Sequence, residues 1–311
     1  MKKFLNINDI EICIDDTEHG ENSLLLIHGL TGNKTTMYPI RDMFKDDYRV
    51  ITIDTRGHGE STRPKKYTID DHAYDIHEII KELNLENVNI LGYSMGSYIA
   101  LRTAEVKCDN IDNLILLCTK PHGKTSSVAR LLKEADMDIT QVTQEEMMGV
   151  ILKASLAPQS YEKAINGELN VEELLKGDES QELSEEEKAA EDASLANFDN
   201  SNDYDKVTCR TLVIGAEYDG INPPELGREV ADGIKDAEFE LIKDAGHLVI
   251  VEQPDEFKNI VNNFLNQWNI FYRNLKGCFE LKKFKTTPPN LKHFLTAWLC
   301  IWHMYSSRWM Q

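Results

Sequence analysis

A serine between two glycines, Ser94 in the segment Gly92-Tyr93-Ser94-Met95-Gly96, is the residue of this sequence best suited to act as a nucleophile. It follows the apolar run at 88–91 and precedes a helix-forming stretch, so the serine is expected on a sharp turn from strand to helix. Such a turn raises the hydroxyl above the sheet and directs the free N–H groups of the helix N-terminus toward it. The flanking glycines let the two arms of the turn pass close together. The alternative is an ordinary strand-to-helix junction with an incidental serine.

A serine hydroxyl is a weak nucleophile until a base accepts its proton, and histidine is the usual base. Of the nine histidines, His247 directly follows a strand-like run at 238–242 and precedes the last helical pattern. A loop at the carboxyl end of that strand can reach Ser94. His58 is the competitor, but it lies in a glycine-rich segment at 54–61 that we expect to form the floor of the site.

The base needs a carboxylate that fixes its tautomer and stabilises the imidazolium. Asp219 follows the apolar run at 212–214, and it gives the chain order Ser94, Asp219, His247 that this type of site requires. Glu217 is the fallback, although an exposed acid at the end of a strand is the better interpretation of it.

Two backbone N–H groups are needed to stabilise the oxyanion of a tetrahedral intermediate. Met95, the residue after the nucleophile, is predicted to supply one of them. The loop after the first long apolar strand, His28-Gly29-Leu30, is predicted to supply the other from Leu30. His28 and Gly29 are expected to support this loop, His28 as a structural hydrogen-bonding residue. No metal or cofactor is predicted.

Short apolar runs alternate with helical patterns, which is typical of a mostly parallel central sheet flanked by helices, an α/β fold. Strands are predicted as an opening hairpin within 4–14 and at 24–27, 50–53, 88–91, 114–117, 212–214 and 238–242. Helices are predicted at 37–44, 71–83 and 94–106, and in a final segment from Pro254 whose apolar residues recur at helical spacing.

The interval 121–204 interrupts this alternation, and helical patterns lie near 127–135, 144–155 and 171–175. Because it falls between two core strands, we predict a helical cap at 121–204 inserted into a core of residues 1–120 and 205–270. Ten acidic residues between Glu172 and Asp192 are interpreted mainly as a solvated helix face. A basic, aromatic extension at 271–311 has no predicted function, and deletion of residues 272–311 is expected to leave esterase activity intact.

The net charge of −19 disfavours a nucleic-acid partner, because a basic patch is needed to bind phosphates. Six scattered cysteines without CxxC pairs argue against a zinc site. Polar residues near the N-terminus predict no signal peptide, and no apolar run of about 18 residues predicts a transmembrane helix. We therefore expect a cytoplasmic protein that acts on a small molecule, of unknown oligomeric state.

These segments, in this order, resemble the α/β-hydrolase superfamily, in its branch of carboxylesterases, lactonases, cofactor-free haloperoxidases and carbon–carbon-bond hydrolases. The resemblance covers about residues 5–268. The segment around Ser94 is also similar to that of the menaquinone-pathway enzymes that eliminate pyruvate from a succinyl-cyclohexene intermediate. Those enzymes usually carry an arginine just after this segment, where this chain has Ser97 and Tyr98. An uncharged ester is therefore favoured over a polyanion, although Arg102 and Arg130 leave the polyanion open.

Three functions follow from the sequence. The first is a serine esterase that works through an acyl-enzyme on Ser94. The second is the pyruvate-eliminating lyase, 2-succinyl-6-hydroxy-2,4-cyclohexadiene-1-carboxylate synthase, in which Ser94 and His247 act as a base. The third is a non-catalytic ligand-binding protein of the same fold, since a fold does not by itself determine a function.

Overall fold

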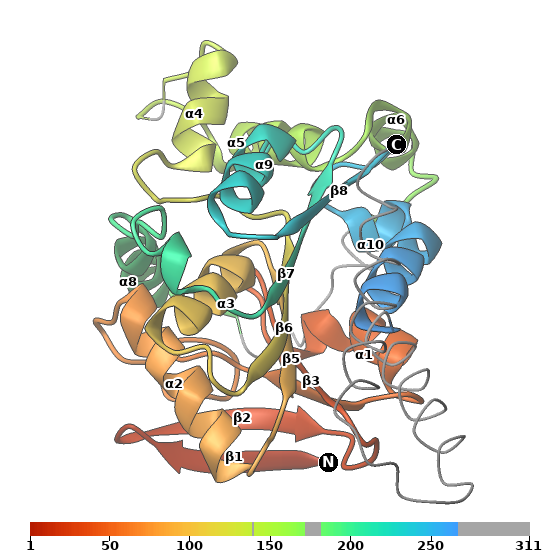
Figure 1. Cartoon of the computed structure of the whole chain (residues 1–311). Coiled ribbons are helices and arrows are strands. Elements are labelled where there is room, and N and C mark those ends of the chain that lie inside the picture. The colour runs from red at the N-terminus through yellow and green to blue at the C-terminus, as the bar shows by residue number, and fades with distance from the viewer. Residues whose placement is uncertain (139, 172–181, 267–311) are drawn as a thin grey trace, which may run out of the picture. The chain divides into compact units, whose positions relative to one another are not determined.

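The computed structural model describes residues 1–138, 140–171 and 182–266, and its centre is an eight-stranded sheet (Figure 1). The strands follow the order β1-β2-β4-β3-β5-β6-β7-β8 across the sheet. Their bounds are β1 Lys2–Ile7, β2 Ile10–Asp16, β3 Ser23–Ile27, β4 Arg49–Ile53, β5 Val88–Tyr93, β6 Ile111–Leu117, β7 Arg210–Ala216 and β8 Glu238–Ile242. The predicted opening hairpin and the six later strands are all present.

The strands β4, β3, β5, β6, β7 and β8 are parallel to one another, whereas β1 and β2 form an antiparallel pair at one edge. The central strands are nearly continuous apolar runs because helices cover both of their faces, and every residue of β3 is buried. Parallel strands end at the same edge of a sheet, so the loops after β3, β5, β6, β7 and β8 meet there. All the predicted site residues follow these strands.

Figure 1 shows α2, α3 and α9 on one face of the sheet and α1 on the other. Their bounds are α1 Tyr38–Phe44, α2 Ile69–Glu82, α3 Met95–Val106 and α9 Pro224–Gly233, with a short α10 at Val249–Glu252 before a helix over 254–266. Short 3-10 turns lie at Lys34–Met37 and Tyr204–Lys206. The helix α2 begins at a capping box in which Thr68 and Asp71 satisfy each other's backbone N–H groups, a feature that fixes where the helix starts.

The insertion between β6 and β7 contains four described helices: α4 Ser127–Glu134, α5 Gln144–Ser155, α6 Pro158–Ile165 and α8 Glu185–Leu195. The predictions at 127–135 and 144–155 are confirmed. The helices α6 and α8 were not predicted from the sequence, while the predicted helix at 171–175 lies almost entirely outside the described residues. The acidic stretch between Glu172 and Asp192 is not solvated throughout, because Glu191 on α8 is only 1% exposed.

The two ends of the insertion are hydrogen-bonded to each other. An antiparallel bridge joins His122 to Asp199, Gly123 N donates to Phe198 O (2.9 Å), and Asn200 N donates to Pro121 O (3.0 Å). The segment therefore leaves and rejoins the core at one point, which supports the division into core and cap that we retain as a proposal.

Residues Met1–Phe264 form one compact unit. The extension at 271–311 lies outside the described residues, and so does every expectation about it. Among the residues that the structure describes, no helix combines the length and the apolar character needed to cross a membrane.

Candidate active site

Ser94 occupies the turn between β5 and α3 in a conformation that is rare for residues other than glycine, with φ 51° and ψ −118°. The two glycines of the motif explain why the chain can make this turn. A Cβ atom on Gly92 would lie 2.1 Å from Gly96 O, and one on Gly96 would lie 2.2 Å from Ile27 O. Neither space accepts a side chain, so the glycines let α3 begin against the ends of β5 and β3. Such strained residues cluster at functional sites.

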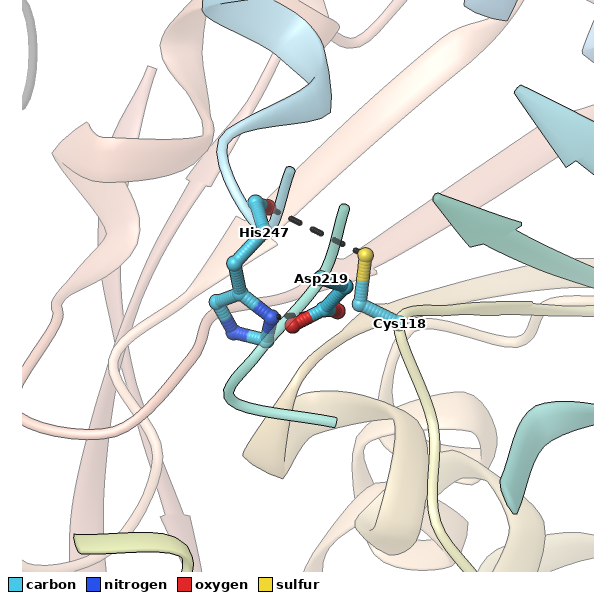
Figure 2. Close-up of side chains that lie close together, drawn as sticks. All are labelled: Cys118, Asp219 and His247. Atoms are coloured by element: carbon cyan, nitrogen blue, oxygen red, sulfur yellow. Dashed lines mark hydrogen bonds and ion pairs between the residues drawn. The ribbon is translucent and has the colours of Figure 1, made fainter. Parts of the chain in front are cut away.

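A continuous hydrogen-bonded chain starts at this serine. His247 Nε2 lies 3.0 Å from Ser94 Oγ, and His247 Nδ1 lies 2.7 Å from Asp219 Oδ2. All three residues are buried. Figure 2 shows the His247 ring turned toward the Asp219 carboxylate. Three residues predicted from separate loops thus meet at distances suitable for proton transfer.

Backbone groups hold the carboxylate of Asp219 in place. Its Oδ1 accepts hydrogen bonds from Ile221 N (2.9 Å) and Asn222 N (2.8 Å), which leaves Oδ2 for the histidine. Asn222 in turn donates to Cys118 O (2.7 Å) and to the hydroxyl of Tyr98 (2.6 Å). The loop after β7 is therefore tied to the ends of β6 and α3, and the orientation of the carboxylate is fixed.

Two neighbours hold the backbone of His247. The hydroxyl of Tyr93 donates to His247 O (3.0 Å), and the tyrosine ring lies 5.3 Å from the imidazole, centroid to centroid. Cys118 Sγ contacts the same carbonyl at 3.8 Å (Figure 2). Burial next to Asp219 holds the pKa of the Cys118 thiol well above its usual range. One possible ligand atom each of Cys118, Asp219 and His247 lies within 4.8 Å of the others, but Asp219 Oδ1 accepts two backbone hydrogen bonds and Oδ2 faces His247 Nδ1.

The predicted oxyanion donors lie on the two elements that flank Ser94. A Cβ atom on Gly29 would lie 3.4 Å from Ser94 Cβ, which places the loop after β3 beside the serine. Met95 is the first residue of α3. Within the described part of the chain, the N–H groups of Leu30 and Met95 have no hydrogen-bond acceptor. Both donors are thus available, and their use stays a prediction.

His28 is a hydrogen-bonding residue, as the sequence analysis expects. Its Nδ1 lies 2.8 Å from Gly29 O, and its Nε2 accepts from Thr55 N at 3.2 Å. Complete burial and the nearby His58 lower the pKa of His28 to about 3, so the ring is neutral and Nδ1 carries the hydrogen. His58 lies elsewhere, in contact with Glu191 of α8 at 2.6 Å, and it has no contact with Ser94. Glu217 is exposed and accepts from Asp244 N.

In the sequence, Arg102 and Arg130 leave a polyanionic substrate open. In the structure, other groups of the protein already occupy both side chains. Arg102 pairs with Asp70, Glu105 and Asp203. Arg130 pairs with Glu134 and donates to carbonyl groups of the loop after Asp219.

A different cation, Lys120, lies close to the site, and it was not predicted from the sequence. Its Nζ is 5.6 Å from the Tyr98 ring centroid and 3.3 Å from Ser127 Oγ. The Tyr98 hydroxyl in turn lies close enough to Ser94 for the serine to affect its pKa. Its position in the sequence could have revealed it, because Lys120 is a cation just after the buried strand β6.

The fold and the geometry agree with the comparisons to known proteins. A family model described as alpha/beta hydrolase fold matches residues 22–254. The chain therefore belongs to the α/β-hydrolase-fold family.

Three relatives illustrate its range. The proline iminopeptidase PfmaB of Pestalotiopsis fici is 26% identical over 277 residues, which cover 82% of this chain and 96% of the relative. A Bacillus subtilis protein provisionally named 2-succinyl-6-hydroxy-2,4-cyclohexadiene-1-carboxylate synthase is 26% identical over 260 residues, covering 81% and 93%. The structure of a thermophilic esterase from Thermogutta terrifontis has a TM-score of 0.69 and 26% identity, covering 86% and 98%.

Proposed function

We propose that this protein is a serine hydrolase that cleaves carboxylic esters of small molecules through an acyl-enzyme on Ser94. The observation that carries the proposal is the hydrogen-bonded chain from Ser94 through His247 to Asp219, at 3.0 and 2.7 Å. A ligand-binding protein would need neither a strained serine nor an aligned base and acid. The esterase among its structural relatives supports the same class of substrate.

In the proposed reaction, His247 Nε2 accepts the proton of the Ser94 hydroxyl while Oγ attacks the ester carbonyl carbon. The carbonyl oxygen becomes an oxyanion that accepts hydrogen bonds from Leu30 N and Met95 N. His247 then protonates the leaving alkoxide, the carbon–oxygen bond breaks, and the alcohol departs. A water molecule, deprotonated by the same nitrogen, attacks the acyl carbon; the bond from this carbon to Ser94 Oγ breaks, His247 returns the proton to Oγ, and the carboxylic acid departs. Asp219 stabilises the imidazolium in both halves.

The acyl-enzyme provides the direct test. Enzyme mixed with p-nitrophenyl acetate and quenched in acid within milliseconds is expected to carry one acetyl group on the peptide that contains Ser94, detected by mass spectrometry. A burst of p-nitrophenolate equal to the enzyme concentration is expected when deacylation limits turnover. Turnover with acetylation at another residue would refute the assignment.

A second candidate function, elimination from a carboxylated substrate by a lyase, is favoured by one observation. Lys120 has no carboxylate partner among the described residues, although it lies beside the ring of Tyr98 close to Ser94. Burial, together with the nearby Arg130, lowers the pKa of Lys120 to about 8, so it is mostly protonated at neutral pH. Such a cation suits a substrate carboxylate. Pyruvate release from the cyclohexadiene intermediate, assayed beside ester cleavage, separates lyase from esterase.

Replacement of Lys120 by methionine tests whether the site selects charge. If Lys120 binds a substrate carboxylate, Lys120→Met is expected to raise KM for a p-nitrophenyl hemisuccinate roughly tenfold, the value of about 1.4 kcal/mol, and to leave KM for p-nitrophenyl butyrate unchanged. In the wild type, the preference for the hemisuccinate should fall as pH rises through about 8, because the lysine loses its charge there. If Lys120→Met changes KM for both esters equally, Lys120 does not bind a substrate carboxylate, and an uncharged ester is again the favoured substrate.

A further inference from the structure

A buried carboxylate of the insertion reaches the loop that carries Leu30. Glu191, on α8, accepts a hydrogen bond from Thr31 N at 2.8 Å through the same Oε1 that contacts His58 Nε2 at 2.6 Å. The side chains of His58 and Glu191 are 0% and 1% exposed. These residues are 133 positions apart in the chain, so the contact joins the insertion to the core at one defined point.

The contacts of the imidazole hold it between the core and Glu191. His58 Nδ1 lies 2.9 Å from Arg56 O, and a backbone carbonyl can only accept a hydrogen bond. Its Nε2 faces the carboxylate of Glu191, which accepts as well when it is ionised. Thr55 Oγ1 lies 3.1 Å from the same Nδ1, so the core holds His58 at one ring nitrogen while the other contacts Glu191. This contact holds the carboxylate in place beside Thr31.

The loop needs such support because Thr31 has φ 54°. Left-handed backbone is unfavourable for a β-branched residue and persists only where its surroundings enforce it. The contact with Glu191 holds the N–H of this strained residue. Without it, the loop could relax toward ordinary backbone angles.

Two fixed peptide planes determine where Leu30 N points. His28 Nδ1 and Gly32 N both donate to Gly29 O, and because a peptide unit is planar, this also sets the direction of the Leu30 N–H. Glu191 fixes the next peptide plane through Thr31 N. The core thus fixes the peptide before Leu30 through Gly29 O, and the insertion fixes the peptide after it through Thr31 N.

We propose that Glu191 is a positioning residue, through which the insertion holds the loop at residues 29–32 so that Leu30 N points at the reacting carbonyl oxygen. This inference rests on the proposed ester hydrolysis, since it assigns Leu30 N to the oxyanion. It predicts an effect on the transition state, where the oxyanion exists, rather than on binding of the neutral ester.

The matched variants are Glu191→Ala, Glu191→Gln and Glu187→Gln. Glu187, one turn earlier on α8, pairs with Arg63 of the core at 3.0 Å, and glutamine at this position keeps the capping box. We expect Glu191→Ala to lower kcat about 10- to 100-fold at nearly constant KM, since losing an oxyanion donor outright costs about 10²–10³-fold. Affinity for a trifluoromethyl ketone, whose adduct carries the oxyanion, should fall by the same factor.

Glu191→Gln keeps an oxygen that can accept from Thr31 N, and it is expected to recover part of kcat. Glu187→Gln should stay within about twofold of the wild type, because its contact does not reach the loop. A merely structural role predicts that the losses follow melting temperature and that Glu187→Gln shares them. That result, or full kcat in a folded Glu191→Ala variant, would overturn the inference.

Hydrogen exchange separates this inference from the proposed function. The amide of Thr31 should exchange faster in Glu191→Ala and at the wild-type rate in Glu187→Gln, whatever the enzyme catalyses. Unchanged exchange at Thr31 would overturn the positioning role even if ester hydrolysis is established. Faster exchange in a protein whose Ser94 is never acylated would instead refute the hydrolase assignment and leave the contact in place.

Discussion

Replacement of Ser94 by alanine is expected to reduce kcat for p-nitrophenyl esters by at least about 10⁴-fold, which corresponds to about 5.5 kcal/mol of transition-state stabilisation. The loss should be this large because serine, histidine and aspartate act as one unit in the proposed mechanism, and the acyl-enzyme cannot form without the hydroxyl. The remaining activity would come from the backbone N–H groups of Leu30 and Met95, which still face the substrate in the variant. KM should change little, since the hydroxyl contributes mainly to the transition state.

The measurement is steady-state kinetics together with labelling by a fluorophosphonate probe. The wild type should be labelled once, on Ser94, and Ser94→Ala should not be labelled. Ser126→Ala is a suitable control, because it removes a surface hydroxyl that caps α4 and has no contact with the site. An Ser94→Ala variant that folds and still hydrolyses esters at more than a hundredth of the wild-type rate would refute the nucleophile assignment.

Replacement of Asp219 by asparagine is expected to lower kcat by about 10⁴-fold without unfolding the protein. Asparagine keeps the oxygen that Ile221 N and Asn222 N require, so the loop after β7 should hold its shape. The atom that faces His247 Nδ1 then becomes an amide donor, which forces the hydrogen onto Nε2. In that tautomer the histidine cannot accept the proton of Ser94.

The control for this variant is Glu217→Gln, two residues away in the same loop. Glu217 is exposed and contacts only Asp244 N within the described chain, so its loss of charge should change kcat less than twofold and stability by no more than about 0.5 kcal/mol. Comparable losses in the two variants would mean that Asp219 acts through the general charge of the loop. Strong activity in Asp219→Asn would reopen the choice of acid.

The residues around Ser94 could be predicted because each follows a strand of the parallel part of the sheet. Parallel strands end at one edge, so a serine, an acid and a histidine placed after β5, β7 and β8 must come near one another. The turn at Ser94 also has a local cause, the close approach of Gly92 and Gly96, which two glycines in the sequence reveal. The sheet and its flanking helices were predicted for the same reason, since their apolar periods are local.

The partners of these residues from the insertion could not be predicted. Glu191 lies among ten acidic residues of 172–192, and nothing in its neighbourhood distinguishes the one that is buried from those that are solvated. Its contacts, with Thr31 and His58, depend on how α8 docks, and periodicity does not encode docking. Lys120 differs, because its place just after the buried strand β6 is visible in the sequence.

The joined ends of the insertion have an evolutionary consequence. Since the bridge between His122 and Asp199 closes the segment at its base, a different segment could be joined to the core at the same place. Loop-closure entropy grows only slowly with length, so the length of a replacement module should matter little, but the hydrogen bonds from Gly220 N to Ala154 O (2.8 Å) and from Leu248 N to Ser155 O (3.2 Å) would have to be kept. A grafted module would bring new selectivity, yet it would arrive without Glu191. Such chimeras should catalyse slowly until a replacement for that carboxylate is selected.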